Sequence, residues 1–493
     1  MTRAAATLVA AAALMLHACG GAPPGREIPD LDIDTPGAWT AAGSDTMAEG
    51  PSSPPTLAWW TAFSDPGLEA VVARALERNH DLAAASARLE EAAALARVAG
   101  ADLYPQVQAA LNASRSKQNF VGFPIPGGGD VLTSYSTSYT ADLRVSWELD
   151  LWGRVRNARS AAGAEAQAAA ADWYGARLSL AARAAGAWFA LTEARSQVAL
   201  AERTVSAYEE TERQVEDRFR RGVRTSLDLR RARSSRAGAE AQLRARLQAL
   251  DAAARGLEIL LGDYPAGRAA GADSLPALPG PVPANLPAEL VARRPDLVAA
   301  ERRLAASGAR AASAKAALYP RISLTASGGT SSNELKDLLD EDFSVWSLLG
   351  NLTAPLFQGG RLRGNLDAAR AREDQTLHAF ASAALGAYAE VEQALAAETL
   401  LRERLVHQTE AAHQAVAARD VAAEQYRSGL IDFIDVLDAQ RSALAAESQL
   451  LAVKRALLDN RIGLHLALGG DFAAHAPEPG VPPGPEELEG TSP

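Results

Sequence analysis

Two stretches of the chain alternate between apolar and polar residues with a period of two, and each is expected to form a β-hairpin. The first covers 105–149, where the residues after Pro105 and those before Leu149 alternate, and the second covers 320–356. This period places apolar side chains on one face of a strand. A soluble sheet packed on helices gives the same alternation as membrane-spanning strands whose outer face meets lipid, so both interpretations stay open at this point.

Each hairpin precedes a stretch with helical periodicity and no proline, over 153–219 and 360–426. A helix of this length extends roughly 100 Å at 1.5 Å per residue, which is too long for a globular core. A glycine-containing turn and a return helix follow, over 226–262 and 433–469. Leucines at every seventh position of the return helices predict coiled-coil packing. They are Leu243, Leu250 and Leu257 in the first and Leu437, Leu444, Leu451 and Leu458 in the second.

These elements occur twice in the same order, which indicates a duplicated structural unit. Gly153 and Asp228 recur as Gly360 and Asp435, each 207 positions later. Each unit begins with a helix that ends at a Tyr-Pro pair, because proline cannot continue a helix. These first helices are expected over about 66–102 and 287–317. The predicted domains are a first repeat over 65–264, a proline-rich linker over 265–286 and a second repeat over 287–472.

The N-terminus has the pattern of an exported lipoprotein. A basic residue precedes an apolar stretch too short to span a bilayer, so residues 1–18 are predicted to be a signal peptide. Cys19 is the only cysteine in the 493 residues and is predicted to receive a lipid, with ordinary cleavage beside an incidental cysteine as the alternative. Residues 19–64 would then be a lipidated tether, and the acidic, proline-rich residues 473–493 a disordered tail.

Composition supports long helices and disfavours other classes of protein. The chain is 48% hydrophobic but only 5% aromatic, a balance that is typical of alanine-rich helices and coiled coils. A net charge of -11 with scattered arginines argues against a nucleic-acid partner. Motifs for a metalloprotease, a phosphate-binding loop or a nucleophile elbow are missing, and His407 and His413 have the wrong helical spacing to share a metal. We therefore expect no enzymatic activity, no metal and no cofactor.

The number of predicted strands constrains the assembly. Four strands cannot close a barrel, since about eight is the practical minimum. A membrane-spanning sheet also cannot leave the polar groups of its edge strands without partners. If the strands of 105–149 and 320–356 cross a membrane, several subunits must therefore contribute to one barrel.

The order of the elements and several local motifs resemble the TolC superfamily of outer-membrane efflux proteins, in particular its lipoprotein branch (OprM- and NodT-like). The resemblance covers about 60–472 and rests on four segments: 147–156, 294–301, 357–361 and 426–440. It implies an α+β membrane protein of the outer membrane, lipid-anchored on the periplasmic side. It also implies a homotrimer, in which four strands per subunit form one β-barrel that continues as a long periplasmic coiled-coil tunnel of α-helices.

The resemblance further places functional residues at the ends of the helical hairpins. Asp435 and Asp438 match the aspartate rings of the family's gate, although a solvated helix face is the alternative for either carboxylate. Asp228 and Tyr426 match a closed-state latch. The turn residues match the tips that contact an adaptor protein, with a simple turn as the alternative. They are Arg221, Gly222 and Val223 in the first hairpin and Ser428, Gly429 and Leu430 in the second.

One latch position departs from the family pattern, because Ile431 stands where the family has an arginine. Arg224 and Arg427 are both close enough in sequence to replace it. The implied partners are a periplasmic adaptor and an inner-membrane transporter of the resistance-nodulation-division type. The implied function is efflux of small molecules such as drugs; a duct for metal ions or for type I protein secretion is the alternative. Outside the channel class, a structural envelope coiled coil would explain the leucine repeats but not the strands.

Overall fold

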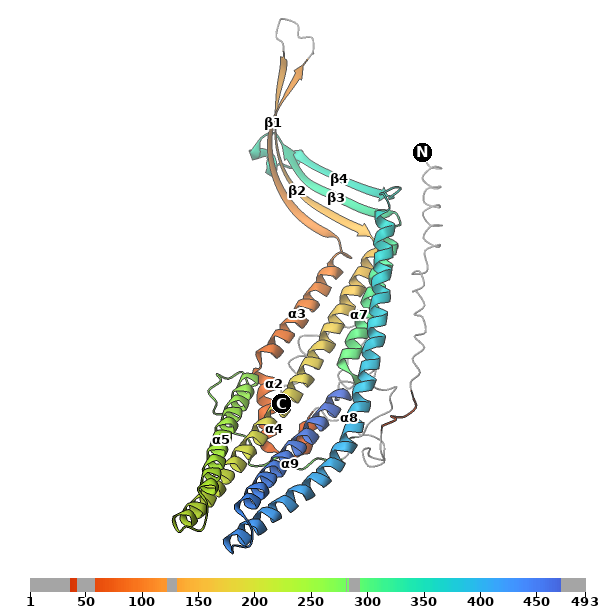
Figure 1. Ribbon diagram of the computed structural model, residues 1–493. Coiled ribbons are helices and arrows are strands. Elements are labelled where there is room, and N and C mark those ends of the chain that lie inside the picture. The colour runs from red at the N-terminus through yellow and green to blue at the C-terminus, as the bar shows by residue number, and fades with distance from the viewer. Residues whose placement is uncertain (1–35, 42–57, 122–130, 281, 283–292, 471–493) are drawn as a thin grey trace.

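The computed structural model describes residues 36–41, 58–121, 131–280, 282 and 293–470, and it has a β-sheet at one end of a long helical bundle (Figure 1). The first half of the chain contains η1 (Trp59–Phe63), α2 (Pro66–Arg78), α3 (His80–Ala101), β1 (Gln106–Val121), β2 (Val131–Leu149), α4 (Arg154–Arg220) and α5 (Ser226–Leu260). The second half contains α7 (Pro295–Ala316), β3 (Arg321–Ser332), η3 (Leu335–Leu339), η4 (Glu341–Phe343), β4 (Ser344–Thr353), α8 (Arg361–Arg427) and α9 (Phe433–Ala467). Residues 1–18, Cys19 and 473–493 lie outside the described residues.

The strands form one antiparallel sheet in the order β1-β2-β3-β4. Its register sets apolar residues opposite one another, such as Leu111 with Ala141 and Ile322 with Leu352. This apolar face is open in a single chain: Leu111 is 73% exposed and Trp346 83% exposed. Among the described residues, no helix is long and apolar enough to cross a membrane.

The strands of the first β-hairpin are longer than those of the second. β1 has 16 residues and β2 has 19, whereas β3 has 12 and β4 has 10. Figure 1 shows the end of the β1–β2 hairpin projecting beyond the rest of the sheet. Much of the extra length of the first β-hairpin is therefore paired strand.

The helical hairpins match one another in length, with 67 residues in α4 and α8 and 35 residues in α5 and α9. In Figure 1 both hairpins run away from the sheet and turn at the opposite end of the molecule. At 1.5 Å per residue, each long helix extends about 100 Å. These dimensions separate the sheet from the two turns, which we call the first tip (221–223) and the second tip (428–430).

The single helix expected over 66–102 is divided into α2 and α3. Asn79 has an extended backbone between them, and its side-chain oxygen accepts hydrogen bonds from the backbone N–H groups of Asp81 and Leu82 at 2.9 and 3.1 Å. Its side-chain amide donates to the carbonyl of Leu260 at 3.0 Å. An asparagine N-cap thus starts a new helix where the apolar periodicity predicted a continuous one.

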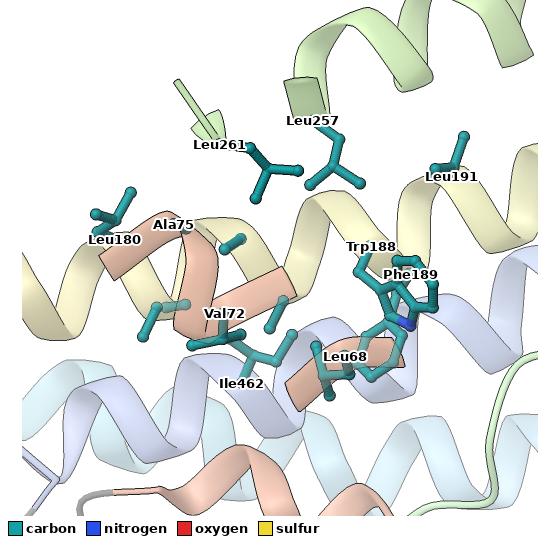
Figure 2. Packing of buried hydrophobic residues seen from close by; sticks show 14 of the residues in the cluster. Leu68, Val72, Ala75, Leu180, Trp188, Phe189, Leu191, Leu257, Leu261 and Ile462 are labelled. Atoms are coloured by element: carbon teal, nitrogen blue, oxygen red, sulfur yellow. The ribbon is translucent and has the colours of Figure 1, made fainter. Parts of the chain in front are cut away.

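The largest core cluster lies midway along the bundle, where α2 and η1 pack on α4 (Figure 2). Leu68 and Val72 of α2 contribute fully buried side chains, and so do Phe189 and Leu191 of α4. Ile462 reaches the same cluster from α9. The short helices η1 and α2 of the first half and the return helix α9 of the second half therefore share one core with α4.

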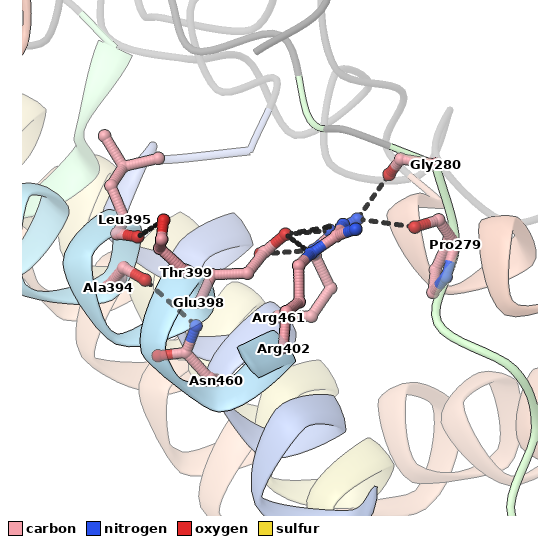
Figure 3. A network of polar contacts seen from close by, with 9 residues as sticks. All are labelled: Pro279, Gly280, Ala394, Leu395, Glu398, Thr399, Arg402, Asn460 and Arg461. Carbon is pink, nitrogen blue, oxygen red and sulfur yellow. Dashed lines mark hydrogen bonds and ion pairs between the residues drawn. The ribbon is translucent and has the colours of Figure 1, made fainter. Parts of the chain in front are cut away.

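A buried ion pair connects α8, α9 and the linker (Figure 3). Arg461 donates to Glu398 at 2.5 and 3.0 Å, and each side chain is 1% exposed. Arg402 also pairs with Glu398, and Arg461 donates to the carbonyls of Pro279 and Gly280. This part of the 265–286 linker is thereby fixed to the second helical hairpin.

A short part of the expected N-terminal tether lies against α8. Trp39 is 6% exposed and packs beside Tyr388, with 6.2 Å between the ring centres. The carboxylate of Glu392 accepts hydrogen bonds from the backbone N–H groups of Thr40 and Ala41, both at 2.8 Å. These contacts hold 39–41 on the surface of the second hairpin.

Candidate functional site

The first tip lies between the C-terminus of α4 and the N-terminus of α5, which are only a few residues apart. Gly222 has a φ of 76°, a left-handed conformation that glycine adopts without steric cost. The N–H of Gly222 donates to the carbonyl of Phe219 at 2.9 Å, and that of Val223 to the carbonyl of Arg218 at 2.9 Å. These two bonds end α4 and reverse the chain.

The second tip repeats this geometry. Gly429 has a φ of 78°, its N–H donates to the carbonyl of Tyr426 at 3.0 Å, and the N–H of Leu430 donates to the carbonyl of Gln425 at 2.8 Å. The N–H of Asp432 then donates to the carboxylate of Asp435 at 3.2 Å, at the start of α9. One carboxylate of the predicted gate therefore also caps its own helix.

Tyr426 is the centre of contact between the two tips. Its side chain is 1% exposed and lies 5.9 Å from the ring of Phe433. The guanidinium carbons of Arg218 and Arg224, both from the first hairpin, lie 4.4 and 5.3 Å from the centre of its ring. These distances fit cation–π contacts, which gain strength when the groups are shielded from water.

Arg224 also makes a direct ion pair across the tips. Its guanidinium donates to the carboxylate of Asp432 at 2.9 Å, and this hydrogen bond raises the pKa of Arg224. The side chain of Arg224 is 19% exposed, whereas that of Asp432 is 76% exposed. Arg427, the other candidate to replace the missing family arginine, pairs instead with Glu424 of its own helix at 2.7 Å. Within one chain, Arg224 thus supplies an ion pair between the hairpins, and Arg218 joins them as well, because its guanidinium donates to the carbonyl of Arg427 at 2.8 Å.

The other predicted latch residue, Asp228, makes a local contact. Its carboxylate accepts a hydrogen bond from the hydroxyl of Thr225 at 3.0 Å and forms a capping box at the start of α5. The hydroxyl of Tyr426 is buried and has no hydrogen-bond partner within the described part of the chain. Inside one subunit, Tyr426 is therefore held by arginines and not by Asp228.

The two predicted gate aspartates lie on one exposed face of α9. Asp435 and Asp438 are exposed, while Val436 and Leu437 between them are buried in a hydrophobic cluster with Tyr426 and Phe433. Asp438 is 4.0 Å from Arg441, at the outer limit of an ion pair. Both carboxylates point away from the core of the subunit, as a surface toward other subunits or solvent requires.

The predicted adaptor-contacting residues form the ends of the two hairpins and are exposed. Val223 is 67% exposed and Leu430 is 74% exposed, so each tip presents an apolar side chain to its surroundings. Arg221 pairs with Asp217 at 2.5 Å. Ser428, Gly222 and Gly429 leave the backbone of both turns uncovered.

The pairing of Arg224 with Asp432 was not predicted from the sequence, although the two repeats carry a signal for it. The equivalent positions, 207 residues apart, hold Ile431 in place of Arg224 and Thr225 in place of Asp432. At these two adjacent positions, the first repeat therefore carries a cation that the second lacks, and the second carries an anion that the first lacks. Such complementary differences are expected where two copies of a unit contact each other asymmetrically.

Comparisons with known proteins agree with this architecture. A family model described as outer membrane efflux protein matches residues 71–263 and again 286–470. The pyoverdine export outer membrane protein OpmQ of Pseudomonas putida is 33% identical over 94% of this chain and 97% of its own length. The toluene efflux pump outer membrane protein TtgF of Pseudomonas putida is 32% identical over 84% of this chain and 86% of its own length.

The solved structure of the outer-membrane channel OprN superimposes with a TM-score of 0.82, at 30% identity, over 91% of this chain and 99% of that chain. The family match extends over most of the chain and includes both helical hairpins and the sheet. The resemblance to the TolC superfamily is thereby confirmed. The chain belongs to the outer membrane efflux protein family.

Proposed function

We propose that this outer-membrane efflux channel works as a homotrimer, in which three four-stranded sheets close one twelve-stranded barrel and three pairs of helical hairpins form a periplasmic tunnel. The observation that carries the proposal is the sheet itself. Its apolar face is exposed, and β1 and β4 are edge strands with unpaired backbone groups. In a bilayer those edges need partners, which neighbouring subunits supply.

Sedimentation of the detergent-extracted protein tests this assembly. We expect a single trimeric species in detergent. After reconstitution into lipid vesicles, the protein should stay in the membrane when the vesicles are washed with urea. A stable monomer with inserted strands would contradict the proposal, since its two sheet edges would lie unpaired in the bilayer.

The names of several relatives support a proposal for the transported cargo. Proteins named for pyoverdine export and for toluene efflux are about one-third identical over most of the chain. We infer that this channel passes small molecules to the exterior, together with a periplasmic adaptor and an inner-membrane transporter of the resistance-nodulation-division type. The exposed tips at 221–223 and 428–430 are the surfaces proposed to contact the adaptor.

Complementation tests the cargo. A strain that lacks its own outer-membrane efflux channels should regain export of a fluorescent dye when it expresses this chain with its adaptor and pump. Export of a metal ion, or of a protein through a type I system, without any effect on dye accumulation would favour one of the alternative cargoes.

The gate proposal rests on position and charge. In a trimer, Asp435 and Asp438 would gather six carboxylates around the narrow periplasmic end, where they attract cations and penalise anions. The Arg224–Asp432 pair and the arginines around Tyr426 hold the two tips of one subunit together. Replacing Asp435 and Asp438 with alanine should reduce cation selectivity in planar bilayers, and unchanged selectivity would remove the aspartate rings from the mechanism.

Lipidation of Cys19 remains a prediction from the sequence. Labelling with a fatty acid should be abolished by Cys19→Ser while the trimer still assembles. Label retained by that variant would exclude the lipid anchor at this position.

A further inference from the structure

The apolar face of β1 gives way to basic residues near the middle of the strand. Because β1 and β2 pair without interruption from Gln106–Ser146 to Val121–Val131, alternate residues keep the same face along the whole strand. Residues 107, 109, 111 and 113 of that face are apolar, and they are followed on the same face by Arg115 and then Lys117. The apolar face of the sheet thus ends in two successive basic residues.

Neither basic side chain has an acidic partner within the described part of the chain. Arg115 lies opposite Thr137, and Lys117 lies opposite Tyr135, with its Nζ 5.7 Å from the centre of that ring. Both are exposed, and Tyr135 is 62% exposed beside them. By contrast, Arg144 on the opposite, polar face of the same hairpin is paired with Asp142.

The height of this basic pair matches a membrane boundary. From Val107 to Lys117 the strand advances ten residues, or about 33 Å at roughly 3.3 Å per residue. With the tilt of about 40° found in membrane barrels, that corresponds to roughly 25 Å along the membrane normal, the height of an apolar band. By the same measure Arg115 lies roughly 20 Å above Val107 along the normal, so the two basic residues occupy the last part of the apolar band, where hydrocarbon gives way to lipid headgroups.

The end of the sheet at which they lie is also defined. The helices join the strands at Gln106 and Leu149, so this end of the hairpin lies next to the helical bundle (Figure 1). In the register of β1 and β2, Arg115 and Lys117 lie nearer to the other end of the hairpin. If the helices occupy the periplasm, as the proposed function requires, the basic pair faces the outer leaflet. The headgroups there belong to lipopolysaccharide, whose lipid A carries phosphate groups.

We propose that Arg115 and Lys117, with Tyr135 beside them, form a binding site for the phosphate groups of outer-leaflet lipid A. Guanidinium and ammonium groups donate charge-assisted hydrogen bonds to phosphate oxygens. The tyrosine supplies an amphipathic ring of the kind that is enriched at membrane boundaries. A trimer carries three such sites on its outside, because pairing of β1 with a neighbour occupies its backbone edge and leaves this face free.

The test compares lipid A binding by the full-length trimer and by Arg115→Gln/Lys117→Gln. The control Arg321→Gln/Arg361→Gln also removes two positive charges, but at the helix end of the sheet. Arg321 begins β3 on the polar face, opposite Thr353, and Arg361 begins α8. Delipidated trimers are titrated with bisphosphorylated lipid A and with dephosphorylated lipid A, and bound lipid is counted by native mass spectrometry. Inorganic phosphate is added as a competitor.

We expect the unaltered trimer to prefer bisphosphorylated lipid A. The double variant should lose about 25-fold in affinity, because each basic residue near an anionic surface contributes about a factor of five. The control should stay within about twofold of the unaltered trimer on the same scale, and inorganic phosphate should not displace the lipid. Equal binding by the double variant, or equal binding of dephosphorylated lipid A, would overturn the assignment.

The inference rests on the proposed membrane barrel, and insertion into vesicles is measured on the same samples. Inserted trimers with phosphate-independent binding would reject the lipid A site and leave the barrel intact. An unaltered chain that fails to insert would reject the barrel, and the lipid A site with it.

Discussion

The two helical hairpins, α4–α5 and α8–α9, have the same lengths and the same turns but differ in which helix is buried. In the first hairpin the long helix α4 carries most of the buried residues, and the return helix α5 carries few. In the second hairpin the return helix α9 is rich in buried residues for its length, and α8 is largely exposed. α4 and α9 contact each other and form the centre of the subunit. Helices of equal length and equal turns therefore differ in burial, because the burial of each helix depends on the elements that pack against it.

In the proposed trimer, the exposed helices α5 and α8 would face the neighbouring subunits. Alanine is frequent on both helices, so each contact would bury little apolar area and stability would depend on assembly. Four tests, each at a position where the other repeat carries a different residue, examine how far this difference between the hairpins extends.

The largest effect is expected in the core of the first hairpin. Phe189 is fully buried, and its ring lies 5.3 Å from that of Phe63, whereas the equivalent residue of the second repeat is Ala396. Phe189→Ala should lower the free energy of unfolding by about 4 kcal/mol, through lost transfer energy and a remaining cavity. Urea unfolding of the detergent-solubilised protein measures it. Leu385→Ala, at a residue of α8 that is 52% exposed, is the control, and an equal loss there would contradict the difference in burial.

The second test exchanges a buried ion pair for its apolar equivalent. Glu398 and Arg461 correspond to Leu191 and Ala254 in the first repeat, where both residues are buried. Arg461→Ala should cost about 3 kcal/mol in unfolding free energy, because it leaves a buried carboxylate with less compensation. The double variant Glu398→Leu/Arg461→Ala should recover more than half of that loss. No recovery would mean that the surroundings of the second hairpin require the ion pair itself.

The third test concerns the pH dependence of stability, to which a buried histidine contributes in the second hairpin only. His465 is buried and stacked on Trp59 at 5.1 Å, and burial, with the nearby charge of Arg461, lowers its pKa from 6.5 to about 4. Its equivalent is Glu258, whose carboxylate accepts backbone hydrogen bonds from Gly267 and Ala269 at 2.7 and 3.0 Å. Because the unfolded chain binds a proton at His465 before the folded protein does, stability should fall as the pH decreases from 6.5 to about 4.

The expected loss over this pH window is about 2 kcal/mol, since one pKa unit corresponds to about 1.4 kcal/mol and part of the shift is relieved by relaxation. His465→Phe should flatten the stability profile between pH 6.5 and 4, and His407→Leu, at an exposed position, should not. Thermal unfolding midpoints across the pH series measure both. An unchanged slope in His465→Phe would assign the dependence to other groups.

The smallest effect on stability is expected for the ion pair next to the two tips. The same substitutions should have a measurable effect on conductance. Arg224→Ile and Asp432→Thr introduce the residues of the opposite repeat at each position. Because Asp432 is largely exposed, each should cost about 1 kcal/mol or less. Each should raise single-channel conductance in planar bilayers, and the charge-reversed pair Arg224→Asp/Asp432→Arg should bring it back toward the starting value. Equal conductance in all four proteins would remove this pair from the closed state.

Much of the local structure could be predicted from the sequence because its signals are local. Helical periodicity without proline gave the long helices to within a few residues, and alternation gave the positions of both hairpins. The interruption at Asn79 escaped prediction, because an asparagine in a periodic stretch caps a helix only if the neighbouring Leu260 carbonyl is in place to orient it. At the tips, the turn residues were identified from glycine and from family motifs, but the partner of Arg224 was not.

The sequence by itself determined the order and type of the main elements, the length of the long helices, the two-fold repetition and the apolar face of the sheet. These depend on periodicity and on residues near one another in the chain. Only the tertiary structure decided that α4 and α9 are central, that Arg461 holds the linker and that Arg224 reaches Asp432. Each of these contacts joins residues far apart in sequence, and two nearly identical hairpins offer equivalent alternatives that periodicity cannot distinguish. The choice between them is made by the side chains that pack across the interface between the repeats.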